Sequence, residues 1–121
     1  MAVDRDRLHT YPGYYSKSIM GATAERMNKE CGPKAMIISI EELSELIKAI
    51  SKNLRFTNNR GIDHNYRQHR EDIIEELADV MISIESIKHK YRIDNGTLEQ
   101  MIAYKLDRVN WKLDNGTFIE I

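Results

Sequence analysis

The fold is decided by two related ten-residue stretches, EELSELIKAI at residues 41–50 and EELADVMISI at residues 75–84. Glu, Glu, Leu and the final Ile are identical in the two stretches, while Glu/Asp, Leu/Val and Ile/Met are conservative exchanges. Around both stretches apolar residues recur at steps of three and four, which is the period of an amphipathic helix. Two such helices joined by one loop usually pack antiparallel, so we expect equivalent residues to face each other across an approximate two-fold axis.

Along the whole chain, the apolar pattern predicts four helices, over residues 18–31, 34–54, 71–91 and 98–113. We expect the second and third helices to bury their apolar stripes as the core. Those stripes are Met36, Ile40, Leu43, Ile47, Ile50 and Leu54, and Ile73, Leu77, Val80, Ile84, Ile87 and Tyr91. Four helices with short connections indicate an all-α fold, a four-helix bundle.

Helix ends are also marked in the sequence. Gly96 is available for a left-handed residue at the end of the third helix. Thr97, followed three residues later by Gln100, is a capping-box pattern for the start of the fourth. Residues 55–70 are expected to be a basic loop, and residues 1–17 an N-terminal arm that precedes a helical domain over residues 18–121.

Composition limits the class of protein. With 121 residues the chain is one domain, and 41% hydrophobic with 31% charged residues suits amphipathic helices. The net charge of −1 disfavours nucleic-acid binding. No apolar run approaches the roughly 20 residues of a membrane span, and no signal-peptide pattern opens the chain, so we expect a cytoplasmic protein. Cys31 is the one cysteine; it excludes an intramolecular disulfide and is expected to be a small core residue.

The two stretches carry paired carboxylates, Glu42 with Glu45 and Glu76 with Asp79. A spacing of three places both members of a pair on adjacent turns of one helix face. Four converging carboxylates would repel one another unless a cation neutralised them, and oxygen ligands of this kind suit Mg²⁺ or Mn²⁺. A di-iron bundle would need Glu-x-x-His on two helices. No histidine follows Glu42 or Glu76 at that spacing, so iron is disfavoured. The alternative is that the four are ordinary solvent-facing acidic residues.

The paired motif, with Glu-Glu-Leu-x-Glu-Leu in one helix and Glu-Glu-Leu-Ala-Asp-Val in the other, resembles the MazG-like all-α nucleoside triphosphate pyrophosphohydrolases. Dimeric dUTPases and phosphoribosyl-ATP pyrophosphohydrolases belong to the same superfamily. The resemblance covers about residues 36–112. It implies Mg²⁺-dependent hydrolysis of a nucleotide at the α–β phosphate bond, which gives a nucleoside monophosphate and pyrophosphate in nucleotide-pool house-cleaning.

The same resemblance implies roles for individual residues. Glu42, Glu45, Glu76 and Asp79 would hold the metal, with Glu45 as the residue that orients the attacking water. Lys105 and Arg108 match a Lys-aromatic-x-Arg segment of the family, with Leu106 in place of the aromatic residue, and are expected at the pyrophosphate end of the substrate.

Other residues have weaker links to function. Arg67 and Arg70 could meet phosphate, although a solvated loop is the simpler interpretation. His64 and His69 have no catalytic partner at a recognisable spacing. Tyr104 and Trp111 could stack on a base, but core packing is favoured.

Two alternatives stay open: phosphoribosyl-ATP hydrolysis, and a non-catalytic helical dimerisation module whose acidic residues only aid solubility. A homodimer or homotetramer is expected because the two central helices carry apolar residues outside their main stripes. These are Ile38, Ala49, Ile74, Met81 and Ile82. The base, the sugar and the length of the phosphate chain are not encoded in any recognisable pattern.

Overall fold

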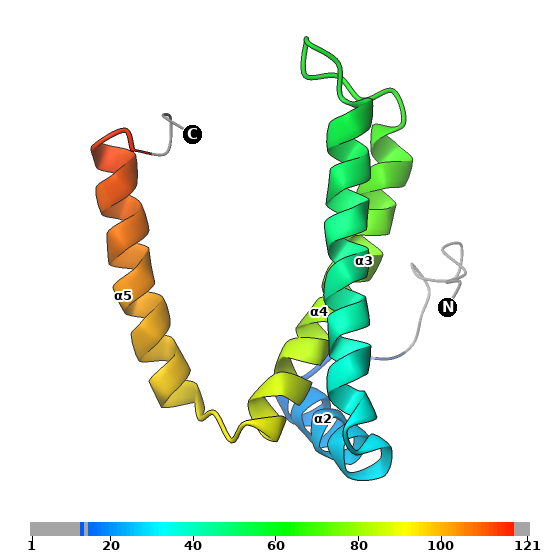
Figure 1. Cartoon of the computed structure of the whole chain (residues 1–121), viewed down its shortest axis with the longest axis vertical. Helices are drawn as coiled ribbons and strands as arrows, with labels where there is room; N and C mark the ends of the chain where they lie inside the picture. Colours follow the sequence, from blue (N-terminus) through cyan, green and yellow to red (C-terminus); the bar gives the residue numbers. More distant parts are fainter. Residues whose placement is uncertain (1–12, 14, 118–121) are drawn as a thin grey trace.

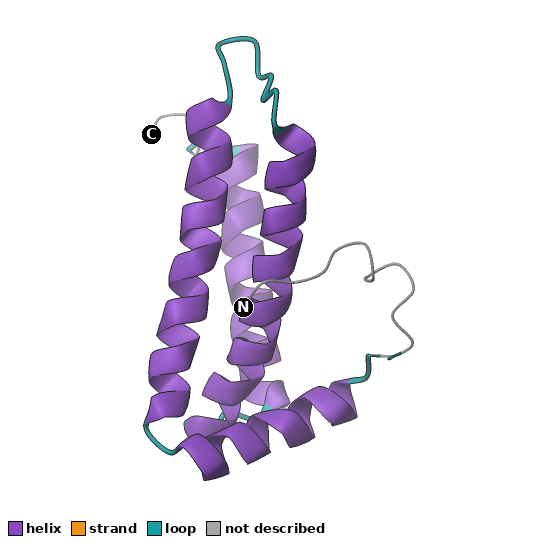
Figure 2. Ribbon diagram, turned by 90° about the vertical axis from the view of Figure 1, so that its right-hand side faces the viewer, coloured by secondary structure: helices purple, strands orange, loops and turns teal. Residues whose placement is uncertain are grey.

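A computed structural model describes residue 13 and residues 15–117. The described part contains four helices, α2 (Lys17–Cys31), α3 (Lys34–Phe56), α4 (Tyr66–Lys90) and α5 (Asn95–Asp114), and no sheet. Figures 1 and 2 show α3 and α4 as a long antiparallel hairpin, with α2 crossing its lower end and α5 rising on its own. The all-α class and the four helices are confirmed. The proposed arm and the last four residues lie outside the described residues, apart from residues 13 and 15–17.

The connection between α3 and α4 is shorter than expected, because α4 begins at Tyr66 rather than at residue 71. Asp63 organises this connection: its side chain accepts from the Asn65 N–H at 2.9 Å, and its carbonyl accepts from the Tyr66 N–H at 3.1 Å. These bonds form the turn that starts the helix early. Arg67 and Arg70 therefore lie on the first turns of α4 and not in a loop.

The hairpin is held by a face of α3 made mostly of small or polar residues. Ala35 and Ser39 are buried there, and Glu42, Leu46, Ala49 and Asn53 are partly buried. On α4 the buried residues are His69, Val80, Ser83 and Ser86. Small side chains allow two helices to approach closely, and the Ser39 hydroxyl is satisfied by the Ala35 carbonyl at 3.0 Å.

The expectation that the main apolar stripes form the core of this chain is wrong for α3 and holds only in part for α4, where Val80 is buried and Ile73 and Ile87 are partly buried. Leu43, Ile50 and Leu54 remain between 37% and 66% exposed, and the described residues bury only Ala24, Ala35 and Val80 among apolar side chains. The reason is rotational: at 100° per residue, the stripe of α3 lies about 95° around the helix from the face that packs on α4. Sequence periodicity locates a stripe but does not say which partner covers it.

Helix α2 packs across the lower end of the hairpin (Figure 1). Ala24 is buried in this contact, and the Asn28 side-chain amide donates to the Ser86 carbonyl at 3.0 Å. Ser16 caps the start of α2 by accepting from the Ile19 N–H at 3.1 Å. Cys31, at the end of α2, is exposed; its expected place in a core is therefore wrong, because α2 ends at Gly32 with this side chain facing solvent.

Helix α5 leaves the hairpin at a well-defined turn. The Ile93 N–H donates to the Lys88 carbonyl at 2.9 Å, and Arg92 adopts a left-handed conformation with φ 53°. This is the hydrogen-bonding pattern of a Schellman end, with arginine where glycine is usual. The N-cap of α5 is Asp94, which accepts from the Thr97 N–H at 3.0 Å. The left-handed residue and the cap thus both differ from the expected Gly96 and Thr97, because the chain turns three to four residues earlier.

Beyond that turn α5 contacts no other described helix. Figure 1 shows it standing apart from α3 and α4. Tyr104 and Trp111 are about 60% exposed, so the interpretation that they pack in a core of this chain is wrong. No helix among the described residues is long and apolar enough to cross a membrane.

Candidate metal centre

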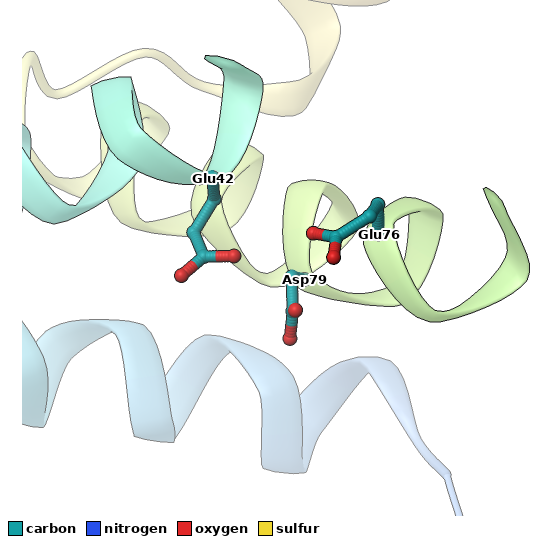
Figure 3. Close-up of side chains that lie close together, drawn as sticks. All are labelled: Glu42, Glu76 and Asp79. Atoms are coloured by element: carbon teal, nitrogen blue, oxygen red, sulfur yellow. The ribbon is translucent and has the colours of Figure 1, made fainter. Parts of the chain in front are cut away.

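Three carboxylates meet where the two related stretches face each other. Glu42 comes from α3, and Glu76 and Asp79 come from successive turns of α4 (Figure 3). One ligand oxygen from each lies within 4.8 Å of the other two, and all three side chains are partly buried. The first member of the acidic pair on α3, Glu42, thus lies against both members of the acidic pair on α4, Glu76 and Asp79.

Glu42 shares the contact face of α3 with Ser39 and Leu46. This position follows from the rotation described above: the residue lies about 115° from the centre of the apolar stripe and therefore points to α4. Figure 3 shows the carboxylates of Glu42 and Asp79 both directed toward α2. The centre is thus formed by α3 and α4 on the side of the hairpin where α2 packs.

Burial and neighbouring charges raise the pKa values of two of these residues, Glu42 and Glu76. Partial burial and the neighbouring charge of Asp79 raise the pKa of Glu42, and a hydrogen bond with Asp79 and the charge of Glu76 act in the same direction. Partial burial also raises the pKa of Glu76, with the charges of Asp79, Glu75 and Glu45 adding to the effect. A bound cation would offset this repulsion.

Glu45 does not belong to the cluster. Its carboxylate accepts from Lys48 Nζ at 3.2 Å on the same helix, and its side chain is 50% exposed. Its charge still contributes to the raised pKa of Glu76, so it stands near the rim of the centre. Of the four expected acidic residues, the structure brings together Glu42, Glu76 and Asp79 and leaves Glu45 beside them.

This donor set can hold a hard divalent cation. Three carboxylate oxygens supply negative charge and no soft ligand, which favours Mg²⁺ or Mn²⁺ over zinc or copper. Oxygens that share one such ion bind it at about 2.0–2.6 Å and so lie within about 5 Å of one another, as these do. Three protein ligands leave coordination positions for water or for phosphate oxygens.

The basic residues expected at the substrate are not gathered at this centre. Lys105 and Arg108 lie on α5, which contacts no other described helix. Arg67 lines a shallow cavity of about 380 Å³ at the start of α4. Arg70 approaches Glu71 at 4.0 Å.

A second buried polar group was not expected from the sequence. His69 Nδ1 hydrogen-bonds the Asp63 carboxylate, and both side chains are almost fully buried. The same carboxylate accepts from the Asn53 side-chain amide at 2.9 Å, and the His69 ring packs on Phe56 with ring centroids 5.3 Å apart. These bonds lower the pKa of Asp63 although burial alone would raise it. No spacing rule identifies such a pair, because the turn at Asp63 creates the contact.

Comparison of the chain with models of protein families, with curated proteins and with solved structures finds no match. The described residues thus form a small all-α fold of four helices with a group of three carboxylates that could hold a metal ion. The particular activity is inferred from this site.

Proposed function

We propose that the protein is a Mg²⁺-dependent nucleotide pyrophosphohydrolase. The observation that carries the proposal is the meeting of Glu42, Glu76 and Asp79, one from the first stretch and two from the second, in a partly buried cluster. The motif that places them resembles the MazG-like enzymes. Nucleoside triphosphates are the proposed substrates, with cleavage at the α–β phosphate bond and a role in nucleotide-pool house-cleaning.

Each residue of the site has a separate role in the proposed reaction. Glu42, Glu76 and Asp79 would hold the cation, which supplies charge neutralisation for the phosphates and lowers the pKa of a bound water. Glu45, at the rim, would orient that water as a hydrogen-bond acceptor. Lys105 and Arg108 would bind the pyrophosphate end of the substrate as charged donors.

The test is a panel of nucleotides incubated with Mg²⁺ and scored for pyrophosphate against orthophosphate. We expect pyrophosphate and a nucleoside monophosphate as the first products. Phosphoribosyl-ATP belongs in the panel, because its hydrolysis would use the same site. Stepwise release of orthophosphate from a triphosphate would contradict the proposal.

Variants connect the activity to the cluster. We expect Glu42→Gln, Glu76→Gln and Asp79→Asn each to lower turnover at least about a hundredfold, since an amide is a poorer ligand for a hard cation. Glu41→Gln is the matched control: it removes the same charge from the neighbouring exposed residue and is expected to leave turnover within about twofold. Near-normal turnover in two of the three cluster variants would reject the assignment.

A non-catalytic helical dimerisation module is the second candidate. It is favoured by the many large apolar side chains that α3, α4 and α5 expose. The two candidates differ in their response to metal: a module of this kind gains no thermal stability from Mg²⁺, whereas an enzyme with the proposed site does. A homodimer or homotetramer is part of both proposals.

A further inference from the structure

A cavity of about 420 Å³ lies at the lower end of the hairpin, between the last turns of α2 and α4 (Figure 1). We call it the basic cavity. Helix α2 contributes Lys29 to its lining, and the end of α4 contributes His89 and Lys90, followed by Arg92. Glu25 is the one acidic residue among the described side chains that line it. Three permanent positive charges therefore face one negative charge.

The walls of the basic cavity are set by the contact between α2 and α4. Asn28, which donates to the Ser86 carbonyl at 3.0 Å, also lines the cavity. His89 and Lys90 follow Ser86 within about one helical turn, so they flank this contact. On the other side, the Gly32 N–H donates to the Asn28 carbonyl at 3.0 Å and ends α2. The cavity is thus formed between two hydrogen-bonded helix ends.

The cations of the basic cavity are not neutralised within the described part of the chain. Lys29, Lys90 and Arg92 form no ion pair with another described residue, whereas nearby Lys88 is paired with Glu85 at 3.1 Å. Two helices end at the cavity, and the partial negative charge of their last carbonyls offsets part of the repulsion among the cations. Positive charge can therefore gather here and remain available to an anion.

Arg92 is held in an unfavourable backbone conformation. It is the one non-glycine residue with a positive φ, 53°, among the described residues. A Cβ atom is disfavoured in this region, and glycine is usual at this position of a Schellman end. The helix dipole does not require an arginine here, because Lys88, His89 and Lys90 already place basic groups in the last turn of α4. A residue kept against such strain indicates that its side chain is used.

A second cavity, of about 780 Å³, adjoins the basic cavity and shares His89 and Arg92 with it. It lies between α2, the end of α4 and the start of α5. Ile93, Leu98 and Ile102 give it apolar surface. A cavity with apolar walls beside a cluster of cations suits a molecule that has an organic part and a charged end.

We propose that the basic cavity binds the polyphosphate group of a small molecule, either a nucleotide or an inorganic polyphosphate. The planar guanidinium of Arg92 matches two phosphate oxygens at once, and Lys29 and Lys90 act as point charges. The site is separate from the acidic cluster, since Lys90 lies about 16 Å beyond Asp79 along α4. It needs no metal ion, because its own side chains supply the positive charge. This inference goes beyond the proposed function and does not depend on it.

The test is calorimetric titration of the full chain with pyrophosphate, in EDTA and at low ionic strength. We expect saturable binding at one site per chain. Arg92→Gly should weaken this binding at least about tenfold. Without ligand, the same variant should melt roughly 2–4 °C higher than the wild type, because glycine relieves the backbone at this position. A residue with a purely structural role would not give these two opposite effects.

Two further variants keep the test decisive if Arg92→Gly does not fold. Lys90→Ala should also weaken binding, without a change in backbone strain. Arg26→Ala is the matched control: it removes one positive charge from α2, but Arg26 is paired with Glu30 and does not line the cavity. We expect its affinity for pyrophosphate to stay within about twofold of the wild type.

Titrations with ATP and with tripolyphosphate, both in EDTA, separate the two sources of the polyphosphate group. Tighter binding of ATP identifies a nucleotide, and equal binding identifies an inorganic polyphosphate. No binding of any of the three probes up to about 1 mM, the weak end of specific affinity, would overturn the proposal, as would equal losses in Arg26→Ala and Lys90→Ala. Since EDTA removes the metal that hydrolysis would need, a protein without hydrolytic activity would reject the enzyme and leave this inference intact.

Discussion

At Glu42, a carboxylate lies in the contact between two helices, a position that usually holds an apolar side chain. It is partly buried next to Asp79 and Glu76, and this arrangement raises its pKa. We expect repulsion among these groups to destabilise the fold, and a cation that binds only the folded cluster would offset this effect. Two predictions follow from this residue and its neighbours.

The first concerns the charge itself. In EDTA we expect Glu42→Gln to melt about 1–4 °C higher than the wild type, because one repelling charge is gone, and to gain less from added Mg²⁺. Glu45→Gln should show a smaller change in both, since Glu45 is half-exposed and paired with Lys48. Thermal melts with EDTA and with a Mg²⁺ titration measure both effects. If Glu45→Gln loses more of the Mg²⁺ shift than Glu42→Gln, Glu45 is the principal ligand.

The second concerns pH. Because the pKa values of Glu42 and Glu76 are raised in the folded chain, the stability linked to them is complete below the unfolded carboxylate pKa of about 4.3 and is lost as pH rises through the raised values. Asp63, whose pKa is lowered, acts in the opposite sense and loses its contribution as pH falls below about 3.9. Urea unfolding in EDTA from pH 3 to 8 should show a free energy of unfolding that falls above pH 4.3. Glu42→Gln should flatten that fall; an unchanged slope in this variant would contradict the assignment.

Among the elements, the α3–α4 hairpin depends on the Asp63–His69 pair at its turn. The hydrogen bond between His69 and Asp63 joins the first turn of α4 to the connection between the helices. A second hydrogen bond, from Asn53, joins Asp63 to α3. Replacing His69 by alanine leaves the Asp63 carboxylate buried beside a cavity, which is destabilising because a buried charge loses its partner.

We therefore expect His69→Ala to lower the melting temperature by at least about 4 °C. The rise in melting temperature caused by Mg²⁺ should stay unchanged, because Glu76 and Asp79 lie about two and three helical turns further along α4. His64→Ala is the control: His64 is exposed in the same turn and its removal should shift the melting temperature by less than about 1 °C. Loss of the Mg²⁺ increment in His69→Ala would show instead that the turn supports the metal centre.

For the molecule as a whole, the acidic cluster and the basic residues of α5 are on parts of the chain that do not touch. If Lys105 acts on the substrate, α5 of a second copy is the element that brings it there. A dimer that combines a Glu42→Gln chain with a Lys105→Ala chain then contains one complete site, built from the intact cluster of one chain and the intact α5 of the other.

We expect co-refolded equal amounts of these two variants to hydrolyse nucleotide at about one quarter of the wild-type rate, since half of the dimers are mixed and one of their two sites is complete. Each variant alone is the control. Activity equal to the mean of the two separate variants would show that Lys105 acts within its own chain or not at all.

Patterns along the chain were sufficient to predict the four helices and three of the four expected members of the acidic cluster. Periodicity located all four helices because a 3.6-residue repeat reflects the geometry of the backbone and needs no knowledge of the partner. The match between residues 41–50 and 75–84 predicted that Glu42, Glu45, Glu76 and Asp79 converge, and three of the four, Glu42, Glu76 and Asp79, do so. Both inferences depend on relations along the chain.

Which apolar surface is covered and which polar groups are buried depend on how the helices pack, and no pattern along the chain predicts this packing. The stripe that includes Ile47 was expected in the core and is instead exposed, because the rotation of α3 depends on the small residues that let α4 approach. Glu45 separates from Glu42 for the same reason, and His69 meets Asp63 only because a turn folds back on α4. A periodic pattern indicates that a helix has an apolar side. Which surface covers that side depends on how closely each available surface can pack against it, within one chain or between two.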